Sequence, residues 1–235
     1  MSWFIIIQDF VELVACIAGF LCWRKIRQSY WRWFPVYLAV IVLTEVAGEY
    51  ALKVDLAINV AIYKYWGIPI QFLFFYWLFH QHFNVKIKNR WPLFSAAIYL
   101  VCLLSDIFSW PGAMYTNVSK SGFLATSYAV GTILLLILSL IYFVKFVKSD
   151  EAISFRSDMM FSVALGLMLF YMLTLPFYML RTFLYYNYRT VFDIYWRAQY
   201  FLDYLMYLMF AVAFIWGRVK QIRNKEQKIR NKKVG

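Results

Sequence analysis

Charged residues are scarce in this sequence. Only 15% of its 235 residues are Asp, Glu, Lys or Arg, whereas 63% are hydrophobic and 22% are aromatic. Soluble domains typically contain about 25% charged residues, and a soluble fold of this length cannot bury so much apolar surface. The composition therefore excludes an ordinary soluble domain, and the mean hydropathy of +0.60 indicates an all-α polytopic membrane protein.

Cysteine and histidine are also rare, which argues against several kinds of site. The three cysteines, Cys16, Cys22 and Cys102, lie within apolar segments, a pattern typical of reduced core residues and not of a disulfide framework. His80 and His82 point in different directions on a helix, and no third ligand is near them in the sequence. We therefore predict no metal site and no cofactor. The motifs H-E-x-x-H and G-x-S-x-G are absent too, so an intramembrane enzyme is a weak hypothesis.

The sequence does contain long apolar segments. The length of each is close to the roughly 20 residues with which a helix crosses a bilayer. Gly, Pro and charged residues mark their boundaries. We predict seven spans, at residues 4–22, 35–52, 61–83, 93–110, 122–144, 159–180 and 198–217. Residues 1–217 then form one seven-transmembrane-helix bundle, followed by a basic cytoplasmic tail at residues 218–235. Gly67 and Pro69 predict an irregularity in the third span.

Basic residues are distributed unequally between the two sides of the predicted bundle. Eighteen of the 24 Lys and Arg residues follow the first, third, fifth or seventh span. Because cytoplasmic loops carry the excess of positive charge, we predict the N-terminus outside and the C-terminus in the cytoplasm. This topology explains the net charge of +12 without nucleic acid as a partner. It also predicts contact with anionic lipid at the basic inner face and tail.

Polar residues within or beside the outer halves of the spans are the main candidates for function. Ionisable groups at membrane depth are costly and by default mark a functional site. The acidic candidates are Asp9, Glu12, Glu45, Glu49, Asp106 and Asp203, with Lys64, Arg197, Gln199 and Tyr200 on the same side. The pair in the first span and the pair in the second span each share one helical face, because their members are three or four residues apart.

Three interpretations of these carboxylates stay open. In the first, the first, second, third and seventh spans form a polar, aromatic-lined cavity that opens to the outside and binds a small polar or cationic ligand. In the second, the carboxylates pair with Lys64, Arg181 or Arg197 and hold the helices together. In the third, they stay protonated or exchange protons with a transported solute.

Pro176 lies well inside the sixth predicted span. Its ring leaves a backbone carbonyl without its helical partner, which neighbouring groups must satisfy. Pro176 is therefore either a hinge or the site of a static kink.

Several stretches resemble a family of small bacterial seven-helix membrane proteins. They are Val11-Glu12-Leu13 with Trp23-Arg24-Lys25, Thr44-Glu45-Val46-Ala47-Gly48-Glu49-Tyr50, Ile141-Tyr142-Phe143 and Leu205-Met206-Tyr207-Leu208. The resemblance covers most of the chain and implies a multi-pass protein of the bacterial inner membrane, with no established activity. A retinal protein is disfavoured, because the last span has no lysine between Arg197 and Arg218.

The leading functional hypothesis is a sensory or signalling membrane module. A ligand would enter the outer acidic and aromatic cavity, shift the sixth and seventh helices, and change what the inner loops and tail present to a separate signalling partner. The alternatives are a transporter of small solutes or ions that uses the same carboxylates, and a scaffold or assembly subunit that docks another membrane protein.

Overall fold

The computed structural model describes residues 2–87, 90–108, 125–148 and 158–217, and within them the chain is helical and has no β-strand. The all-α prediction is thus confirmed for this part of the chain. The predicted basic tail at residues 218–235 lies outside it. The long helices are α1 (Ser2–Leu21), α3 (Trp33–Val54), α5 (Ile68–Ile87), α6 (Trp91–Phe108), α7 (Ala125–Val147), α8 (Met159–Asn187) and α9 (Arg189–Trp216). The short ones are α2 (Trp23–Ile26), the 3₁₀ turn η1 (Tyr30–Arg32), α4 (Leu56–Ile62) and the π-helical turn η2 (Tyr63–Gly67).

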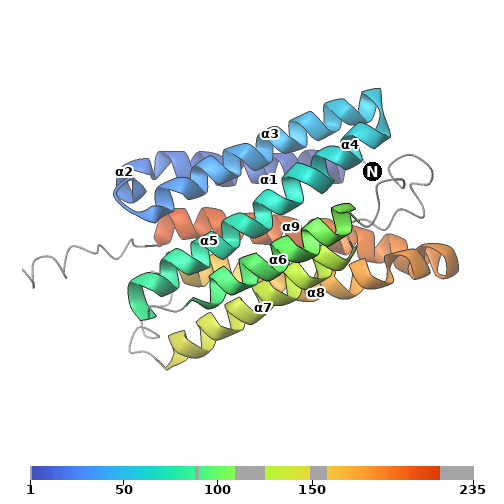
Figure 1. Cartoon of the computed structure of the whole chain (residues 1–235). Coiled ribbons are helices and arrows are strands. Elements are labelled where there is room, and N and C mark those ends of the chain that lie inside the picture. The colour runs from blue at the N-terminus through green and yellow to red at the C-terminus, as the bar shows by residue number, and fades with distance from the viewer. Residues whose placement is uncertain (1, 88–89, 109–124, 149–157, 218–235) are drawn as a thin grey trace, which may run out of the picture.

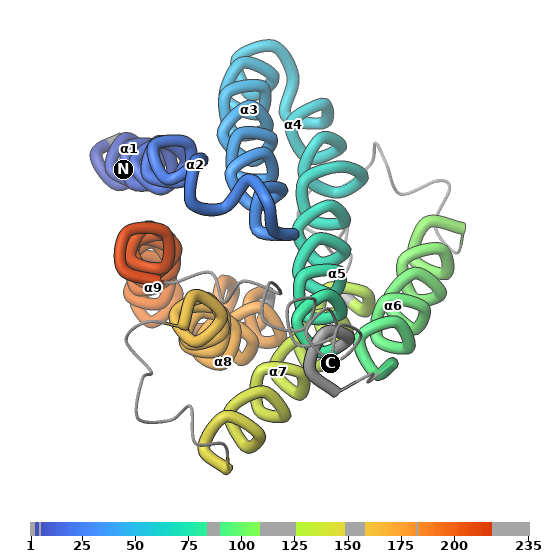
Figure 2. Tube along the Cα trace, turned by 90° about the vertical axis from the view of Figure 1, so that its left-hand side faces the viewer, coloured from blue at the N-terminus to red at the C-terminus, as the bar shows by residue number. Residues whose placement is uncertain are grey.

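The helices form a closed ring in chain order. Neighbours along the chain pack side by side, and α1 packs against α9 to close the ring. Figure 2 shows this order from one end, with α4, η2 and α5 forming a single rod between α3 and α6. The ring brings the first and last helices together, although they lie about as far apart in the sequence as two helices can.

Aromatic side chains fill the space enclosed by the ring of helices. The ring centroid of Phe34 on α3 lies 5.1 Å from that of Phe210 and 5.2 Å from that of Phe214, both on α9. Phe72 of α5 is completely buried and contacts aromatic rings of three helices, Tyr99 of α6, Tyr128 of α7 and Tyr171 of α8. Such large rings bury much apolar area at a few positions, so they connect helices that are not adjacent in the sequence.

Among the described residues, five helical segments are long and apolar enough to cross a membrane. They are Tyr30–Val54, Trp91–Phe108, Thr126–Val147, Met159–Arg181 and Arg189–Trp216. Large apolar side chains also cover the outside of the bundle, where Leu43 and Val101 are each 67% exposed. An outer surface of this kind suits lipid and not water, as expected for a multi-pass membrane protein. Helices α1, with its two carboxylates, and α5 are not among the five.

The helix boundaries depart from the predicted spans at three places. Helices α8 and α9 extend seven and nine residues past the apolar windows towards each other. The extended part of α9 contains an i,i+4 ion pair between Arg189 and Asp193, whose Nε and Oδ1 atoms lie 3.6 Å apart. Such a pair stabilises a helix that is exposed to water. The third rod begins at Leu56, because the Asp55 side chain accepts the backbone N–H of Ala57 at 2.8 Å and caps it. The irregularity predicted near Pro69 is the π-helical turn η2.

Arg24, Lys25 and Arg27 of the α2 turn lie at one end of the bundle. The turn that carries α2 and the C-terminal end of α9 lie together at this end, and the α3–α4 and α8–α9 turns lie at the other (Figure 1). Lys25 connects α2 to the C-terminal end of α9, because its Nζ donates to the carbonyl oxygens of Phe214 at 2.9 Å and Ile215 at 3.4 Å. A cation at a helix C-terminus is favourable, so this contact stabilises the junction between α2 and α9.

Pro176 lies within α8, which continues through it as one helix, and its side chain is exposed. Two residues before Pro176, the Thr174 hydroxyl donates to the Phe170 carbonyl oxygen at 2.8 Å. A side-chain bond of this kind often bends a helix. A moving hinge at Pro176 stays a prediction.

Candidate functional site

Carboxylates from three helices meet near the middle of the ring, and we call them the carboxylate cluster. They are Asp9 and Glu12 of α1, Glu45 and Glu49 of α3, and Asp203 of α9. Glu12 interacts electrostatically with Glu45, Asp203 and Asp9, and Asp203 interacts with Glu45. The structure thus brings together five of the six acidic candidates, although Asp203 lies more than 150 residues after the others in the chain.

Glu12 is the most deeply buried member, with only 2% of its surface exposed. Its Oε1 accepts a hydrogen bond from Gln8 Nε2 at 3.1 Å, one turn earlier on α1. Its Oε2 is buried and has no hydrogen-bond partner. Buried polar atoms are nearly always paired, and each exception needs an explanation such as a missing ion or ligand. Glu12 therefore offers one free acceptor to a group that enters the cluster.

Glu45 is held by a tyrosine from the adjacent rod. The Tyr63 hydroxyl, at the start of η2, donates a hydrogen bond to Glu45 Oε2. Gly48 makes room for this contact, since a Cβ at Gly48 would lie only 2.6 Å from the Tyr63 hydroxyl. Asn59 donates to the Gly48 carbonyl oxygen at 2.7 Å and holds α4 against the same turn of α3. The π-helical turn thus directs a phenol at a membrane carboxylate, and π-helical turns are frequent at functional sites.

Burial increases stepwise through the cluster. Glu49 is exposed, Asp9, Glu45 and Asp203 are half-buried, and Glu12 is buried. Asp9 and Glu49 are close enough for their carboxyl groups to share a hydrogen bond. The series of carboxylates therefore leads from the surface of α3 to the interior between α1 and α9.

Tyrosines surround the deep part of the cluster. Tyr37 and Tyr207 are buried and lie within electrostatic range of Glu12 and Asp203. Nearer the surface, the Tyr200 ring stacks on Phe4 at 6.0 Å, and the Tyr204 hydroxyl donates to the Phe4 carbonyl oxygen at 2.5 Å. Phenol rings beside carboxylates suit an organic cation, because the ring face attracts positive charge.

The basic side chains that could neutralise these carboxylates lie elsewhere. Lys64 Nζ lies over the Tyr65 ring at 5.2 Å, and the Arg181 guanidinium lies over the Trp196 ring at the same distance. Arg197 is exposed. Within the described residues, Arg189 forms an ion pair with Asp193, and no Lys or Arg forms an ion pair with a carboxylate of the cluster. The interpretation that the carboxylates are ion-paired helix pins has no support in this part of the chain.

Two candidates from the sequence make their hydrogen bonds to residues outside the cluster. Asp106 accepts the backbone N–H of Ser127 at 2.8 Å, so it caps the first turn of α7, and its helix packs on α5 and α7. Gln199 donates to the Tyr178 hydroxyl at 2.5 Å and connects α9 to α8. A structural role accounts for both contacts.

Several residues of this site are not among the candidates from the sequence, including Gln8, Gly48, Tyr37 and Tyr207. The spacing of Gln8 and Glu12, four residues apart, is a signal that could have found their hydrogen bond. No local pattern shows that Tyr63 reaches Glu45, because the contact depends on how α3 packs against the next rod.

The cluster lacks the geometry of a metal site. Among the described residues, no three His, Cys, Asp or Glu side chains converge in a way that could hold a metal ion. What the arrangement offers is a group of carboxyl groups, one unpaired carboxyl oxygen and aromatic ring faces.

The contact between Tyr63 and Glu45 makes a testable prediction. Tyr63→Phe should lower stability in detergent by about 1–3 kcal/mol, because it leaves a half-buried carboxylate without its donor. Gly48→Ala should have a similar effect, since its methyl group displaces the same hydroxyl, and the double variant should be little worse than either single variant. Thermal unfolding of the purified proteins measures this, with Tyr65→Phe, an exposed tyrosine of the same turn, as the control. Fully additive losses would contradict the shared contact.

Comparison with known proteins identifies no relative: no family model matches the chain, and neither a curated protein nor a solved structure matches it.

Proposed function

We propose that this protein is a sensory or signalling membrane module that binds a small organic cation at the carboxylate cluster. The observation that carries the proposal is Glu12, which is 2% exposed and has an unpaired Oε2, among carboxylates that no basic side chain neutralises in the described residues. Several like charges in a low-dielectric site repel one another strongly. A bound cation relieves this repulsion and supplies the missing partner.

The proposed topology is a seven-helix bundle with the N-terminus outside and the C-terminus in the cytoplasm. Counting α4, η2 and α5 as one rod gives seven rods in the described chain, and the α2 turn with Arg24, Lys25 and Arg27 lies at the end that the positive-inside rule assigns to the cytoplasm. The cluster then lies in the outer half and the middle of the membrane, where Glu49 is its exposed entrance.

Reporter fusions test this topology. Fusions after Lys88, Lys148 and residue 235 should have cytoplasmic activity, and fusions near Lys53, Ser119 and Asn187 should have external activity, because the bias of basic residues acts on short loops. Paired alkaline phosphatase and green fluorescent protein fusions at each position measure it. An external C-terminus would reverse the orientation and place the cluster on the cytoplasmic side.

Ligand binding is tested with a cation and a neutral molecule of the same shape. Choline and 3,3-dimethylbutanol differ in charge and hardly in shape. If the cluster binds organic cations, choline and related amines should raise the melting temperature of the purified protein, as any ligand of the native state does. The neutral alcohol should not. Equal effects of both compounds, or no effect of any amine in a panel, would exclude the proposed ligand class.

A second candidate function is transport of the cation in exchange for protons, and the stepwise burial from Glu49 to Glu12 favours it. A path of carboxylates can pass a cation or proton inwards, and the π-helical turn beside Glu45 interrupts a helix, as in many transporters. Reconstituted vesicles distinguish the two functions. A sensor binds the labelled amine without accumulating it, whereas a transporter accumulates it and responds to a pH gradient.

A further inference from the structure

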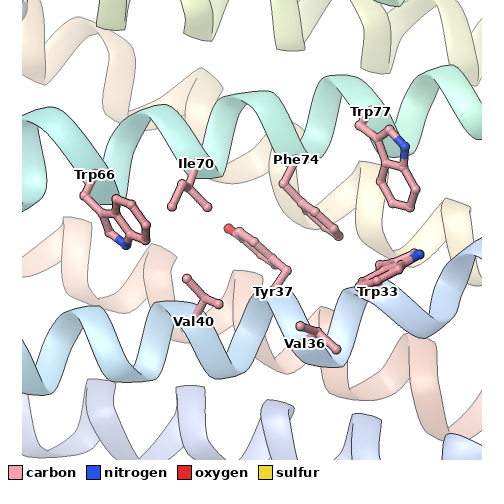
Figure 3. A pocket seen from close by; sticks show the side chains of 8 residues that line it. All are labelled: Trp33, Val36, Tyr37, Val40, Trp66, Ile70, Phe74 and Trp77. Atoms are coloured by element: carbon pink, nitrogen blue, oxygen red, sulfur yellow. The ribbon is translucent and has the colours of Figure 1, made fainter.

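A groove of about 490 Å³ lies between α3 and the rod formed by η2 and α5. Four residues at helical spacing, Trp33, Val36, Tyr37 and Val40, line it from α3. The other wall consists of Trp66, Ile70, Phe74 and Trp77 (Figure 3). None of the eight belongs to the carboxylate cluster, and no lining side chain carries a charge.

The geometry points to a specific binding site for one anionic phospholipid, with an acyl chain in this groove and the phosphate beside Arg32. This inference goes beyond the proposed function and does not depend on the carboxylate cluster. It follows from the length, the closed ends and the charge of the groove.

The groove has the length of one acyl chain. Trp66 and Trp77 are eleven residues apart, which corresponds to about 16 Å along a helix. One leaflet is half of a hydrocarbon core of about 30 Å. Aromatic rings from the two walls of the groove meet, because the rings of Tyr37 and Phe74 stack at 4.1 Å with an angle of 1°. A flexible methylene chain can lie along such apolar walls.

Both ends of the groove are closed by indole rings. Trp33 and Trp77 close one end, and Trp66 closes the other (Figure 3). A helix of a partner protein, which is about 10 Å wide with its side chains, would have to run past these rings. A single acyl chain ends between them, so the shape favours lipid over a protein helix or a second copy of this chain.

Positive charge lies at the end formed by Trp33 and Trp77. The exposed Arg32 guanidinium lies 5.3 Å from the centroid of the Trp33 ring, and the indole nitrogens of Trp33 and Trp77 lie at this end as well (Figure 3). Indole N–H groups are favoured at headgroup depth, and guanidinium groups bind phosphate through several donors. This end therefore suits a phosphate, and the uncharged remainder suits the acyl chain.

Native mass spectrometry of the purified, delipidated protein tests the site with dioleoylphosphatidylglycerol and dioleoylphosphatidylcholine. The wild type should bind one phosphatidylglycerol more tightly than one phosphatidylcholine. Arg32→Gln should lower the ratio of the two lipid affinities by about fivefold, the amount expected for one basic residue at an anionic surface. Val40→Trp, which fills the groove, should weaken both lipids by about tenfold or more through lost apolar contact. Val46→Trp, on an exposed face of the same helix away from the groove, is the matched control and should bind like the wild type.

Three outcomes would overturn the inference. Unchanged lipid binding by Val40→Trp would show that the acyl chain does not lie in the groove. An unchanged preference of Arg32→Gln for phosphatidylglycerol would show that the headgroup does not lie beside Arg32. Arg32 is exposed, so this variant folds even where a groove variant does not. A dimer in the wild type that Val40→Trp dissociates would identify a second copy as the occupant.

Discussion

Glu12→Gln should abolish cation binding without lowering the stability of the protein. Removing one partner of a buried charge pair typically costs about 2–5 kcal/mol, so affinity should fall by about 30-fold or more. The amide keeps the shape of the side chain, and its carbonyl can still accept the hydrogen bond from Gln8. The other oxygen has no protein partner to lose, and the repulsion from Glu45 and Asp203 disappears. The melting temperature without ligand should therefore stay the same or rise.

Isothermal titration with choline and thermal unfolding of the same preparation measure both quantities. Asp193→Asn is the matched control, because it makes the same chemical change at an exposed carboxylate paired with Arg189, and it should bind like the wild type. Asp203→Asn should repeat the result of Glu12→Gln. A clear loss of stability with unchanged binding would make Glu12 a structural residue and would favour the scaffold hypothesis.

Gly19→Val should cause a large loss of stability, because the added side chain forces three helices apart. Gly19 lies where α1, α3 and α9 meet, and a Cβ at this position would lie 2.8 Å from Pro35 Cγ and 3.1 Å from Phe214 Cε2. The proline ring cannot rotate away, so the helices must separate. Overpacking of this kind costs about 1–3 kcal/mol and occasionally more. Small residues permit such close approach between membrane helices.

Thermal unfolding in detergent checks this effect, with Gly19→Ala expected to be intermediate. Ala47→Val adds bulk on the exposed side of α3 and should be nearly neutral. Cation binding should weaken together with stability in Gly19→Val, since α1 carries Asp9 and Glu12. A fully stable Gly19→Val would show that α1 does not pack against Pro35 and Phe214.

The expectation that the carboxylates of α3 and α9 face one site implies that these two helices are neighbours, but α1 lies between them in the ring. Their aromatic side chains do meet, as Phe34 contacts Phe210 and Phe214, and Asp203 interacts with Glu45. Helix α1 packs against both and contributes Glu12 between them. Burial makes Glu12 the central residue of the site.

Local sequence patterns determined the helices of this protein and which carboxylates can share a face of a helix. Hydropathy and residue spacing act within one segment, so Glu45 and Glu49 are recognisable as a pair before any helix is packed. The tertiary structure decided that Asp203 joins Glu12, that Asp106 caps α7, and that Tyr63 reaches Glu45 across Gly48. The physical reason is that lipid and protein interior are both apolar. An apolar helix therefore carries little information about which side faces its neighbours, and only the packing of rings and small residues determines its rotation.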